Sequence, residues 1–239
     1  DKRCLIVDGV LNSFAPAGLT EYTIPNSVTE IGSQTFYNCS SLASVTIPNS
    51  VTTIGDWAFR DCSSLTSVTI PDSVIEIGSD AFSGCSSLPS VTIPNSVTEI
   101  GYSAFFGCSS LTSVTIPNSV TTLGTNPFEG CSKLTEFNGK FASADKRCLI
   151  VDGVLNSFAP AGLTEYTIPD SVTEIGGNAF EYCRSLTSVT IPNSVTKIEG
   201  HTFRNCSSLK SVYCKPTTPP QGGSYMFSDN ATGRKIYVP

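Results

Sequence analysis

The chain has 239 residues, of which 39% are hydrophobic and only 14% are charged, so its polarity comes mainly from Ser, Thr and Asn. The formal net charge is −6 and Lys and Arg form no run in the sequence, which argues against a phosphate-following groove and against nucleic acid as a partner. No stretch of about 18 apolar residues occurs, so we predict no membrane span in this chain.

The first 18 residues are irregular and carry a hairpin signal. Asp8-Gly9 separates two apolar runs, a pattern typical of a tight β-hairpin. The start of the sequence shows no signal peptide. Residues 1–32 recur at 145–176 with a single difference. We therefore expect a fragment of a longer protein or a mature form, with any export signal or anchor outside this chain.

A repeat of 23 residues follows and predicts the fold. Each regular copy begins at a leucine, and these leucines are Leu19, Leu42, Leu65, Leu88, Leu111, Leu163 and Leu186. A fixed period of this length predicts a solenoid, in which each coil buries its apolar side only against its neighbours. Such scaffolds bind partners far more often than they catalyse reactions.

Numbering each copy from its leucine gives the positions a structural interpretation. Val or Tyr at position 4 and Ile at position 6 alternate with polar residues, which predicts a strand with one buried face. Pro at position 7 ends that strand, and Asn or Asp with Ser then turns the chain. The apolar residues at positions 10 and 13 form a second buried edge. Gly at position 14 suits a positive φ, and Ala-Phe-x-x-Cys predicts one turn of α- or 3₁₀-helix.

The prediction is therefore a repeat solenoid, mainly β, with stacked parallel strands and short helical turns on the opposite side. Regular repeats cover 19–133 and 163–208. Hairpin-containing variant coils cover 1–18 and 134–162, where Asp152-Gly153 repeats the hairpin signal, and a degenerate last copy covers 209–239. We predict that all of them form a single domain.

Seven of the ten cysteines occupy position 21 of the repeat: Cys39, Cys62, Cys85, Cys108, Cys131, Cys183 and Cys206. Equivalent residues on stacked coils lie about 4.8 Å apart, wider than the mean Cβ separation of about 3.8 Å in a disulfide. We therefore expect buried free thiols at these seven positions. Cys4, Cys148 and Cys214 lie outside the ladder, and Cys206 with Cys214 is a minor disulfide candidate.

The phrase Leu-x-x-Val-x-Ile-Pro-x-x-Val-x-x-Ile-Gly-x-x-Ala-Phe-x-x-Cys stands at 65–85, 88–108 and, with Glu199 and Thr202 as departures, at 186–206. It resembles the BspA-like class of leucine-rich repeats. The resemblance implies a secreted or surface-exposed protein, and adhesion to host matrix proteins such as fibronectin or fibrinogen or to other cells. The family has no catalytic residues to transfer to this chain, and its repeat consensus encodes the fold rather than a ligand.

Two sets of residues are candidates for ligand binding. The first is the row of hydroxyls at positions 3 and 5, which includes Ser67, Thr69, Ser90, Thr92, Ser113 and Thr115. The second is the set of aromatic residues at the variable positions 15, 16, 19 and 20: Tyr37, Trp57, Tyr102, Phe106 and Tyr182. In the alternative interpretation, the hydroxyls only keep a parallel sheet soluble and the aromatics cover the edges of the core.

The sequence predicts no catalytic residues, no metal site and no cofactor. It has one histidine, His201, no Cys-x-x-Cys pair and no calcium-binding loop. We therefore predict non-catalytic binding of a protein or a glycan at the cell surface. The alternatives are a structural spacer that presents another domain and a glycan-binding accessory protein.

Overall fold

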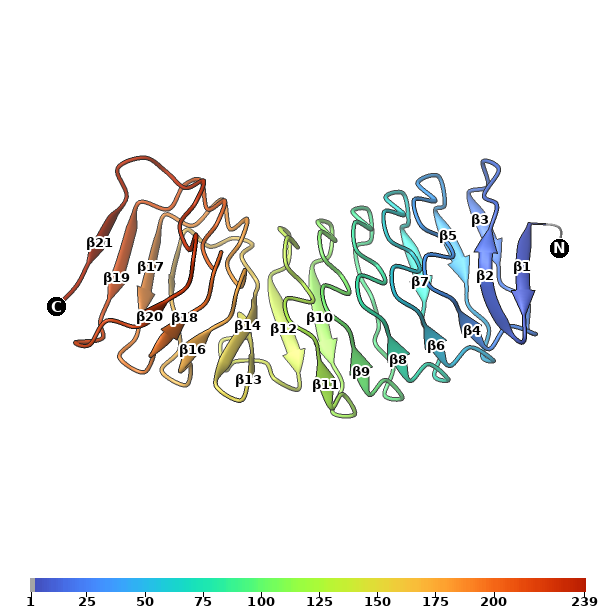
Figure 1. Ribbon diagram of the computed structural model, residues 1–239, viewed down its shortest axis with the longest axis horizontal. Coiled ribbons are helices and arrows are strands. Elements are labelled where there is room, and N and C mark those ends of the chain that lie inside the picture. Colours follow the sequence, from blue (N-terminus) through green and yellow to red (C-terminus); the bar gives the residue numbers. More distant parts are fainter. Residues whose placement is uncertain (1–2) are drawn as a thin grey trace. The chain divides into compact units, whose positions relative to one another are not determined.

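The computed structural model describes residues 3–239, which fold into stacked coils of β-structure (Figure 1). The chain divides into two compact units. The first comprises Asp1–Cys131 with Asn138–Lys140, and the second Ser132–Phe137 with Phe141–Pro239. The chain passes between the units three times, and one of these points, between Phe137 and Asn138, lies within strand β12 (Glu136–Gly139). The single domain expected from the sequence remains a prediction.

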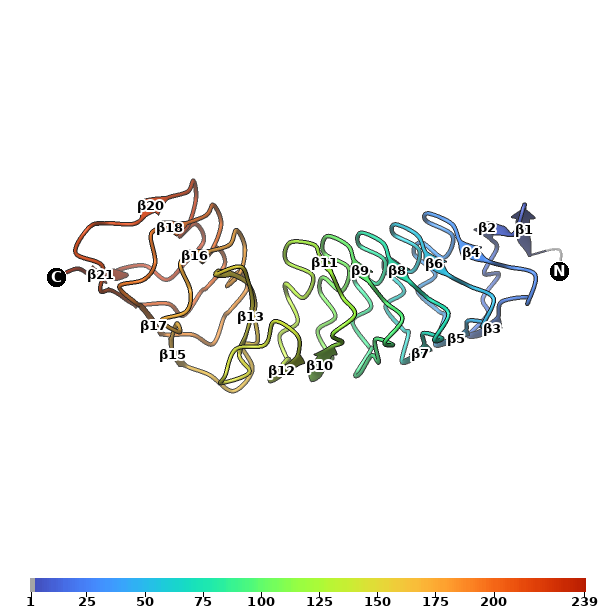
Figure 2. The same ribbon diagram turned by 90° about the horizontal axis from the view of Figure 1, so that it is seen from below.

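The first unit carries two rows of strands on different sides of its coils (Figure 2). One sheet has the order β1-β2-β4-β6-β8-β9-β11. Its strands are β1 (Cys4–Val7), β2 (Val10–Phe14), β4 (Glu30–Ile31), β6 (Thr53–Ile54), β8 (Glu76–Ile77), β9 (Glu99–Ile100) and β11 (Thr122–Leu123). The other side has β3 (Glu21–Thr23), β5 (Ser44–Thr46) and β7 (Ser67–Thr69) in one sheet, and β10 (Ser113–Ile116) further along the chain.

The second unit repeats this plan. One sheet has β13 (Cys148–Val151), β14 (Val154–Phe158), β16 (Glu174–Ile175), β18 (Lys197–Ile198) and β20 (Gln221–Gly222). The other has β15 (Glu165–Thr167), β17 (Ser188–Ile191), β19 (Ser211–Cys214) and β21 (Lys235–Tyr237). In both units the strands of successive coils pair in parallel and in register, so the predicted solenoid of stacked parallel strands is confirmed.

Both predicted hairpins are confirmed. β1 pairs antiparallel with β2, and β13 with β14. The two turn residues of the first hairpin, Asp8 and Gly9, have φ values of 51° and 82°. Two successive positive φ values define the type I′ turn, whose twist matches that of the flanking strands, and Asp-Gly adopts it at low cost.

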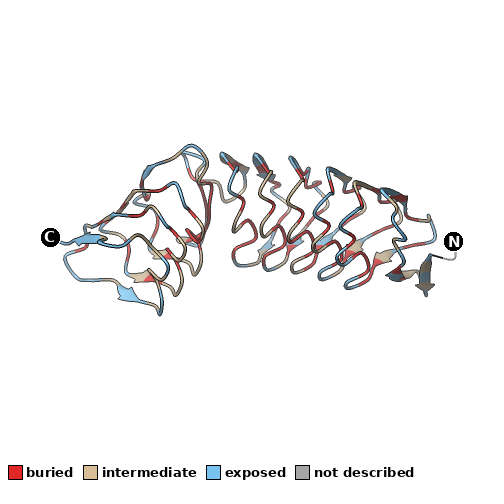
Figure 3. Ribbon diagram, turned by 90° about the horizontal axis from the view of Figure 1, so that it is seen from above, coloured by how far each residue is buried: buried red, intermediate tan, exposed pale blue. Residues whose placement is uncertain are grey.

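Buried residues recur along successive coils (Figure 3), and at several repeat positions the same residue type is buried in each coil. Phenylalanine rings at position 18 stack face to face in the first unit, with centroids 4.9–5.3 Å apart and planes within 7°: Phe36, Phe59, Phe82, Phe105 and Phe128. All five are fully buried. Burying one such side chain contributes about 1.5–3 kcal/mol, so this column is a main source of stability.

The predicted helical turn is not formed, and no helix occurs in residues 3–239. The residues at repeat positions 16 and 20 have positive φ values, as in Gln34 (60°) and Asn38 (57°). A right-handed helix excludes such values. Instead, the amides of Gln34 and Asn38 donate to the next coil, to the carbonyls of Asp56 (2.9 Å) and Arg60 (2.8 Å). This side of each coil is therefore a tight turn that hydrogen-bonds to its neighbour.

The expectation of a positive φ at repeat position 14 is wrong. Gly55 and its equivalents lie outside that region. A Cβ atom at Gly55 would lie 2.8 Å from the Ile31 carbonyl oxygen and 3.0 Å from the Ser33 amide nitrogen. In this coil glycine is required because the backbone of the preceding coil approaches too closely for a side chain, whereas the coil that begins at Leu186 accommodates Glu199 at the same position.

The ladder cysteines are buried and all ten cysteines are free, so Cys206 and Cys214 form no disulfide. The Cys62 thiol donates to the Phe36 carbonyl in the preceding coil, with Sγ 3.2 Å from the oxygen. The Cys85 thiol makes the same contact with the Phe59 carbonyl. Cysteine suits this position because it is small, mostly apolar and still a weak donor.

Candidate interaction site

Three of the five predicted aromatic candidates are on the surface. Tyr37, Trp57 and Tyr102 have 48%, 39% and 49% of their area exposed, whereas Phe106 and Tyr182 are half-buried. The exposed side chains are large and partly apolar, which makes them suited to contact another molecule. Their role in binding stays a prediction.

The structure brings Tyr37 and Trp57 together with Arg60 on two adjacent coils of the first unit. Tyr37 and Arg60 occupy the same repeat position in neighbouring coils, and the turns that carry them are joined by the Asn38–Arg60 backbone hydrogen bond. The guanidinium carbon of Arg60 lies 4.9 Å from the centre of the Trp57 ring, a cation–π geometry. We call Tyr37, Trp57 and Arg60 the aromatic–arginine cluster.

Two carboxylates hold Arg60 in this position. Its Nη1 donates to Asp80 Oδ1 at 3.1 Å, and its Nε lies 3.7 Å from Asp61 Oδ2. Asp80 comes from the next coil, so the guanidinium is held by Trp57 and Asp61 of its own coil and by Asp80 of the next. Side chains that are fixed before binding lose less entropy when a partner docks.

Tyr102, Phe106 and Tyr182 do not join this cluster. No ring contact connects Tyr102 with Trp57 or with Phe106 among the described residues. Ser103 has a φ of 49°, so the segment from Tyr102 to Phe106 is not the helical turn on which residues four apart would meet. Tyr182 lies in the second unit, where Arg184 stands 5.6 Å from its ring centre.

The row of exposed hydroxyls is present, but its strands are interrupted at one coil. Ser67 and Thr69 lie on β7, exposed and in register with Ser44 and Thr46 on β5. Ser113 and Thr115 are exposed on β10. Ser90 and Thr92 are exposed but lie outside any strand, which corrects the expectation of a continuous sheet. The reason is Pro89, which has no amide hydrogen to donate where Thr66 donates to the preceding coil.

Sequence reasoning missed a second aromatic site, in the second unit. Tyr213 on β19 and Tyr237 on β21 are partners in register. Their rings stack with centroids 4.7 Å apart and an interplanar angle of 12°, and each is a little over 40% exposed. The available signal was that Tyr213 replaces Thr at position 5 of the degenerate last copy.

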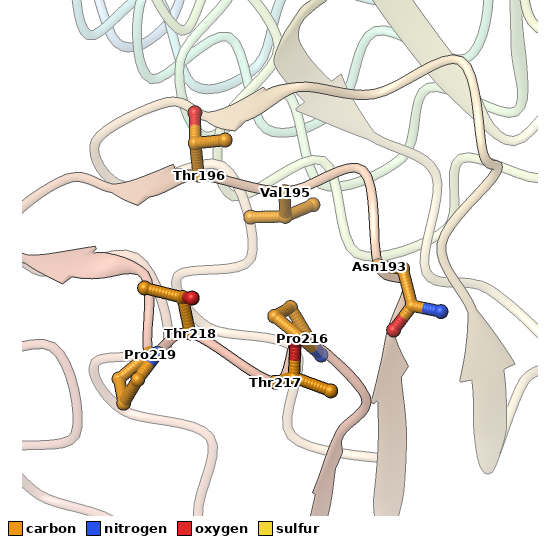
Figure 4. A pocket seen from close by; sticks show the side chains of 7 residues that line it. All are labelled: Asn193, Val195, Thr196, Pro216, Thr217, Thr218 and Pro219. Carbon is orange, nitrogen blue, oxygen red and sulfur yellow. The ribbon is translucent and has the colours of Figure 1, made fainter.

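Two hollows adjoin at this end of the second unit and share Asn193. One, of about 430 Å³, is lined by Tyr213, Cys214, Lys215, Tyr237, Val238 and Pro239 in addition to Asn193. The other, of about 380 Å³, lies between the 193–196 turn and the Pro216–Pro219 loop. Figure 4 shows Val195 and Thr196 on one side of it, Thr218 and Pro219 on the other, and Asn193 at its end.

The remaining candidate chemistry is sparse. No group of three or more His, Cys, Asp or Glu side chains in residues 3–239 is arranged to hold a metal ion. His201 is half-buried and stacks on Tyr225 with centroids 5.6 Å apart. No helix in the described part of the chain is long and apolar enough to cross a membrane.

Comparison with known proteins identifies the repeat. The family model described as "BspA type Leucine rich repeat region (6 copies)" matches residues 11–135 and 155–239. No curated protein is significantly similar in sequence.

Solved structures include a leucine rich cell surface protein from Faecalibacterium prausnitzii A2-165. It is 29% identical, with a TM-score of 0.63, over 96% of this chain and 71% of that one. A leucine-rich repeat protein from Bacteroides ovatus is 27% identical, with a TM-score of 0.57, over 96% of this chain and 73% of that one. The pneumococcal vaccine antigen PcpA, 20% identical, shares the fold with a TM-score of 0.68 over 96% of this chain and 80% of its own.

Proposed function

Because this chain belongs to the BspA type leucine-rich repeat family, we propose that it is a non-catalytic binding protein of the cell surface, which adheres to an extracellular protein or to another cell. The family model matches most of the chain, and this match places the chain in the family. The Faecalibacterium relative, whose description names it a cell surface protein, supports the proposed location. Host matrix proteins such as fibronectin or fibrinogen are the first partners to test.

One observation carries the proposal: the aromatic–arginine cluster of the first unit. Trp, Tyr and Arg are the residue types that contribute most to protein interfaces. Here residues of all three types lie on two adjacent coils, with Arg60 stacked on Trp57 and paired with Asp80. The core packing does not require them, since other coils carry Ser83 and Asn126 at the same repeat positions. A fixed, exposed group of such residues is suited to serve as the anchor of an interface.

The test uses substitutions that the fold already accepts elsewhere. Trp57→Asn and Tyr37→Ser place in this cluster the residues found at equivalent positions of other coils. Binding of the full chain to fibronectin and fibrinogen is measured by surface plasmon resonance. We expect each substitution to weaken binding by about tenfold or more, since interface anchors contribute about 2 kcal/mol or more.

Tyr225→Asn is the matched control, because Tyr225 is 72% exposed, lies in the second unit and occupies the same repeat position as Trp57. It should leave binding to these proteins unchanged. Saturable binding that survives both cluster substitutions would refute the role of the cluster. No saturable binding to any matrix protein or cell would instead favour the structural spacer.

A further inference from the structure

We propose that the end of the second unit around Tyr213 and Tyr237 is a binding site for an anionic glycan, one that carries carboxylate or sulfate groups. This site is separate from the aromatic–arginine cluster and goes beyond the proposed protein adhesion. Its elements are the stacked tyrosine pair, the lysines that flank it, and the two hollows that share Asn193.

Strand geometry places lysines on both sides of the tyrosine pair. Side chains two residues apart on a strand point to the same face, about 7 Å from each other. Lys235 precedes Tyr237 at this spacing on β21, and Lys215, which follows the last residue of β19, lines the same hollow as both tyrosines. Because Tyr213 pairs with Tyr237 in register, their two stacked rings lie together, with Lys235 nearby on β21 and Lys215 at the adjoining hollow.

The local charge is opposite to that of the whole chain. Residues 209–239 contain four basic residues and one acidic residue, a net charge of +3 in a protein of net charge −6. Lys210, Lys215 and Lys235 are exposed and form no ion pair with a described residue. The one acidic residue on the exposed face of this sheet, Glu165, is separated from Lys235 by the two strands that carry Ser188 and Ser211. Unpaired lysines on such a surface favour an anionic partner.

The lining groups match a sugar chain in particular. An exposed tyrosine ring offers a flat, electron-rich face to the C–H face of a sugar ring and a hydroxyl for hydrogen bonding. Asn193 supplies both an amide donor and an acceptor between the two hollows, and Thr217 and Thr218 add hydroxyls in the second one. Two adjoining hollows of about 380 and 430 Å³ suit consecutive units of a linear oligosaccharide.

The loop that forms the second hollow explains why other coils lack it. Regular coils pass from strand to strand through Pro-Asn-Ser-Val or Pro-Asp-Ser-Val, and in three of them the serine hydroxyl donates to the preceding coil, as Ser50 does to the Val28 carbonyl at 2.6 Å. The last coil has the longer loop Lys215-Pro216-Thr217-Thr218-Pro219-Pro220 instead. It stands away from the 193–196 turn (Figure 4) and leaves the space open.

The test measures binding of the full chain to three hexasaccharides by calorimetry: heparin-derived (sulfate and carboxylate), hyaluronan-derived (carboxylate) and maltohexaose (neutral). We expect at least one anionic probe to bind about tenfold or more tighter than maltohexaose, and added salt to weaken that binding because it screens exposed charges. The two anionic probes distinguish sulfate from carboxylate recognition. Equal binding of maltohexaose would overturn the proposal.

Variants locate the site without endangering the fold. The double substitution Tyr213→Thr with Tyr237→Thr installs at position 5 the residue that Thr167 and Thr190 already provide in this sheet. We expect it, and Lys215→Gln with Lys235→Gln, to weaken anionic binding by about tenfold. The matched controls Tyr225→Asn and Lys133→Gln should retain full affinity. Retained binding in both double variants would refute this site.

Two further measurements separate the glycan from other anionic partners. A hexaglutamate peptide or a thymidine hexanucleotide that binds as tightly as the best hexasaccharide would show recognition of charge alone and would overturn glycan specificity. The half-buried Cys214 lines the first hollow, so its labelling by a maleimide in a Cys4→Ser background reports occupancy. We expect the bound hexasaccharide to slow this labelling several-fold. Binding with no protection of Cys214 would place the glycan elsewhere.

Discussion

The residue at repeat position 16 holds a left-handed backbone whatever its side chain is. Trp57, Asp80 and His201 have φ values of 59°, 53° and 59°. This conformation costs about 1–2 kcal/mol for most residues and less for Asn or Asp. Trp57 therefore occupies a position where a smaller polar residue is better suited to the fold. This cost supports the interpretation that it is present for an interaction with a partner.

A prediction about stability follows for Trp57→Asn. The substitution relieves the left-handed strain and removes the stacking of Arg60, two effects of about 1 kcal/mol with opposite signs. We expect the free energy of unfolding to change by less than about 1 kcal/mol, while binding to the partner weakens by about tenfold or more. Urea unfolding of the wild-type protein and of the variant measures this change in unfolding free energy. A loss of several kcal/mol would show that Trp57 serves the fold.

Carboxylates at repeat position 12 make stability depend on pH. Glu76 and Glu99 are neighbours in register on β8 and β9. Burial, then the charges of Glu99, Asp56 and Glu30, raise the pKa of Glu76 above its ordinary value of 4.5. A raised carboxyl pKa means that protonation favours the folded state. This contribution is complete below pH 4.5 and is lost as the pH rises through the folded-state pKa.

We therefore expect Glu76→Gln to raise the melting temperature at pH 7, where the carboxylates repel each other. The gain should be no more than a few tenths of a kcal/mol because solvent screens exposed charges. It should disappear at about pH 3, where wild-type Glu76 is protonated. Glu21→Gln is the control, since its neighbour in register is the uncharged Ser44. A gain in melting temperature that is larger at low pH would contradict a raised pKa of Glu76.

At the level of the strand, a single residue decides whether the hydroxyl-bearing sheet continues. Regular coils donate a hydrogen bond from position 2 to the preceding coil, as Thr66 does to the Ala43 carbonyl at 2.9 Å. Pro89 cannot donate, and no strand forms at 90–92. The sheet β3-β5-β7 ends there. Any ligand that follows the hydroxyl row therefore meets a break at this coil.

Pro89→Thr should repair that break. Thr66, Thr112 and Thr187 show that the fold accepts threonine at this position. We expect hydrogen exchange of the amides at 90–92 to slow by about tenfold, while the unfolding free energy changes by about 1 kcal/mol or less, because the new hydrogen bond offsets the lost rigidity of proline. The reverse substitution, Thr112→Pro, should speed exchange in β10. Unchanged exchange in both variants would contradict this explanation.

At the level of the whole molecule, the cysteines are structural. All ten are free, and eight are buried, with only Cys4 and Cys214 half-buried. Burial raises the pKa of the Cys131 thiol to about 12 and that of Cys148 to about 12. Thiols with such pKa values hold almost no reactive thiolate at neutral pH. The protein is therefore not built on a disulfide framework, although its cysteine count alone would suggest one.

Thiol titration without reductant checks this. In the native protein at pH 8 we expect fast reaction of the two half-buried cysteines at most, and in about 6 M guanidinium chloride we expect all ten to react. Cys62→Ala should cost about 1–3 kcal/mol, because it leaves the Phe36 carbonyl without its thiol donor and opens a small cavity. Fewer than ten reactive thiols in the unfolded protein would indicate disulfides.

The sequence by itself determined the repeating unit. The leucine at position 1, the alternation around positions 4 and 6, and the proline at position 7 act within one coil or against its nearest neighbour. Strands, turns and both Asp-Gly hairpins were therefore predictable, since each depends on a few adjacent residues. The same reasoning failed at the Ala-Phe-x-x-Cys turn, because its spacing fits a helix and only the bonds to the next coil show otherwise.

The tertiary structure alone decided which side chains meet between coils. Arg60 reaches Asp80 twenty residues away, and Tyr213 stacks on Tyr237 because β19 and β21 pair in register. Gly55 at position 14 is required by the close backbone of another coil, not by its own φ. Contacts of this kind depend on the exact stacking of one coil on the next. The candidate sites therefore emerge from substitutions that are scattered in the sequence and become neighbours only when the coils are stacked.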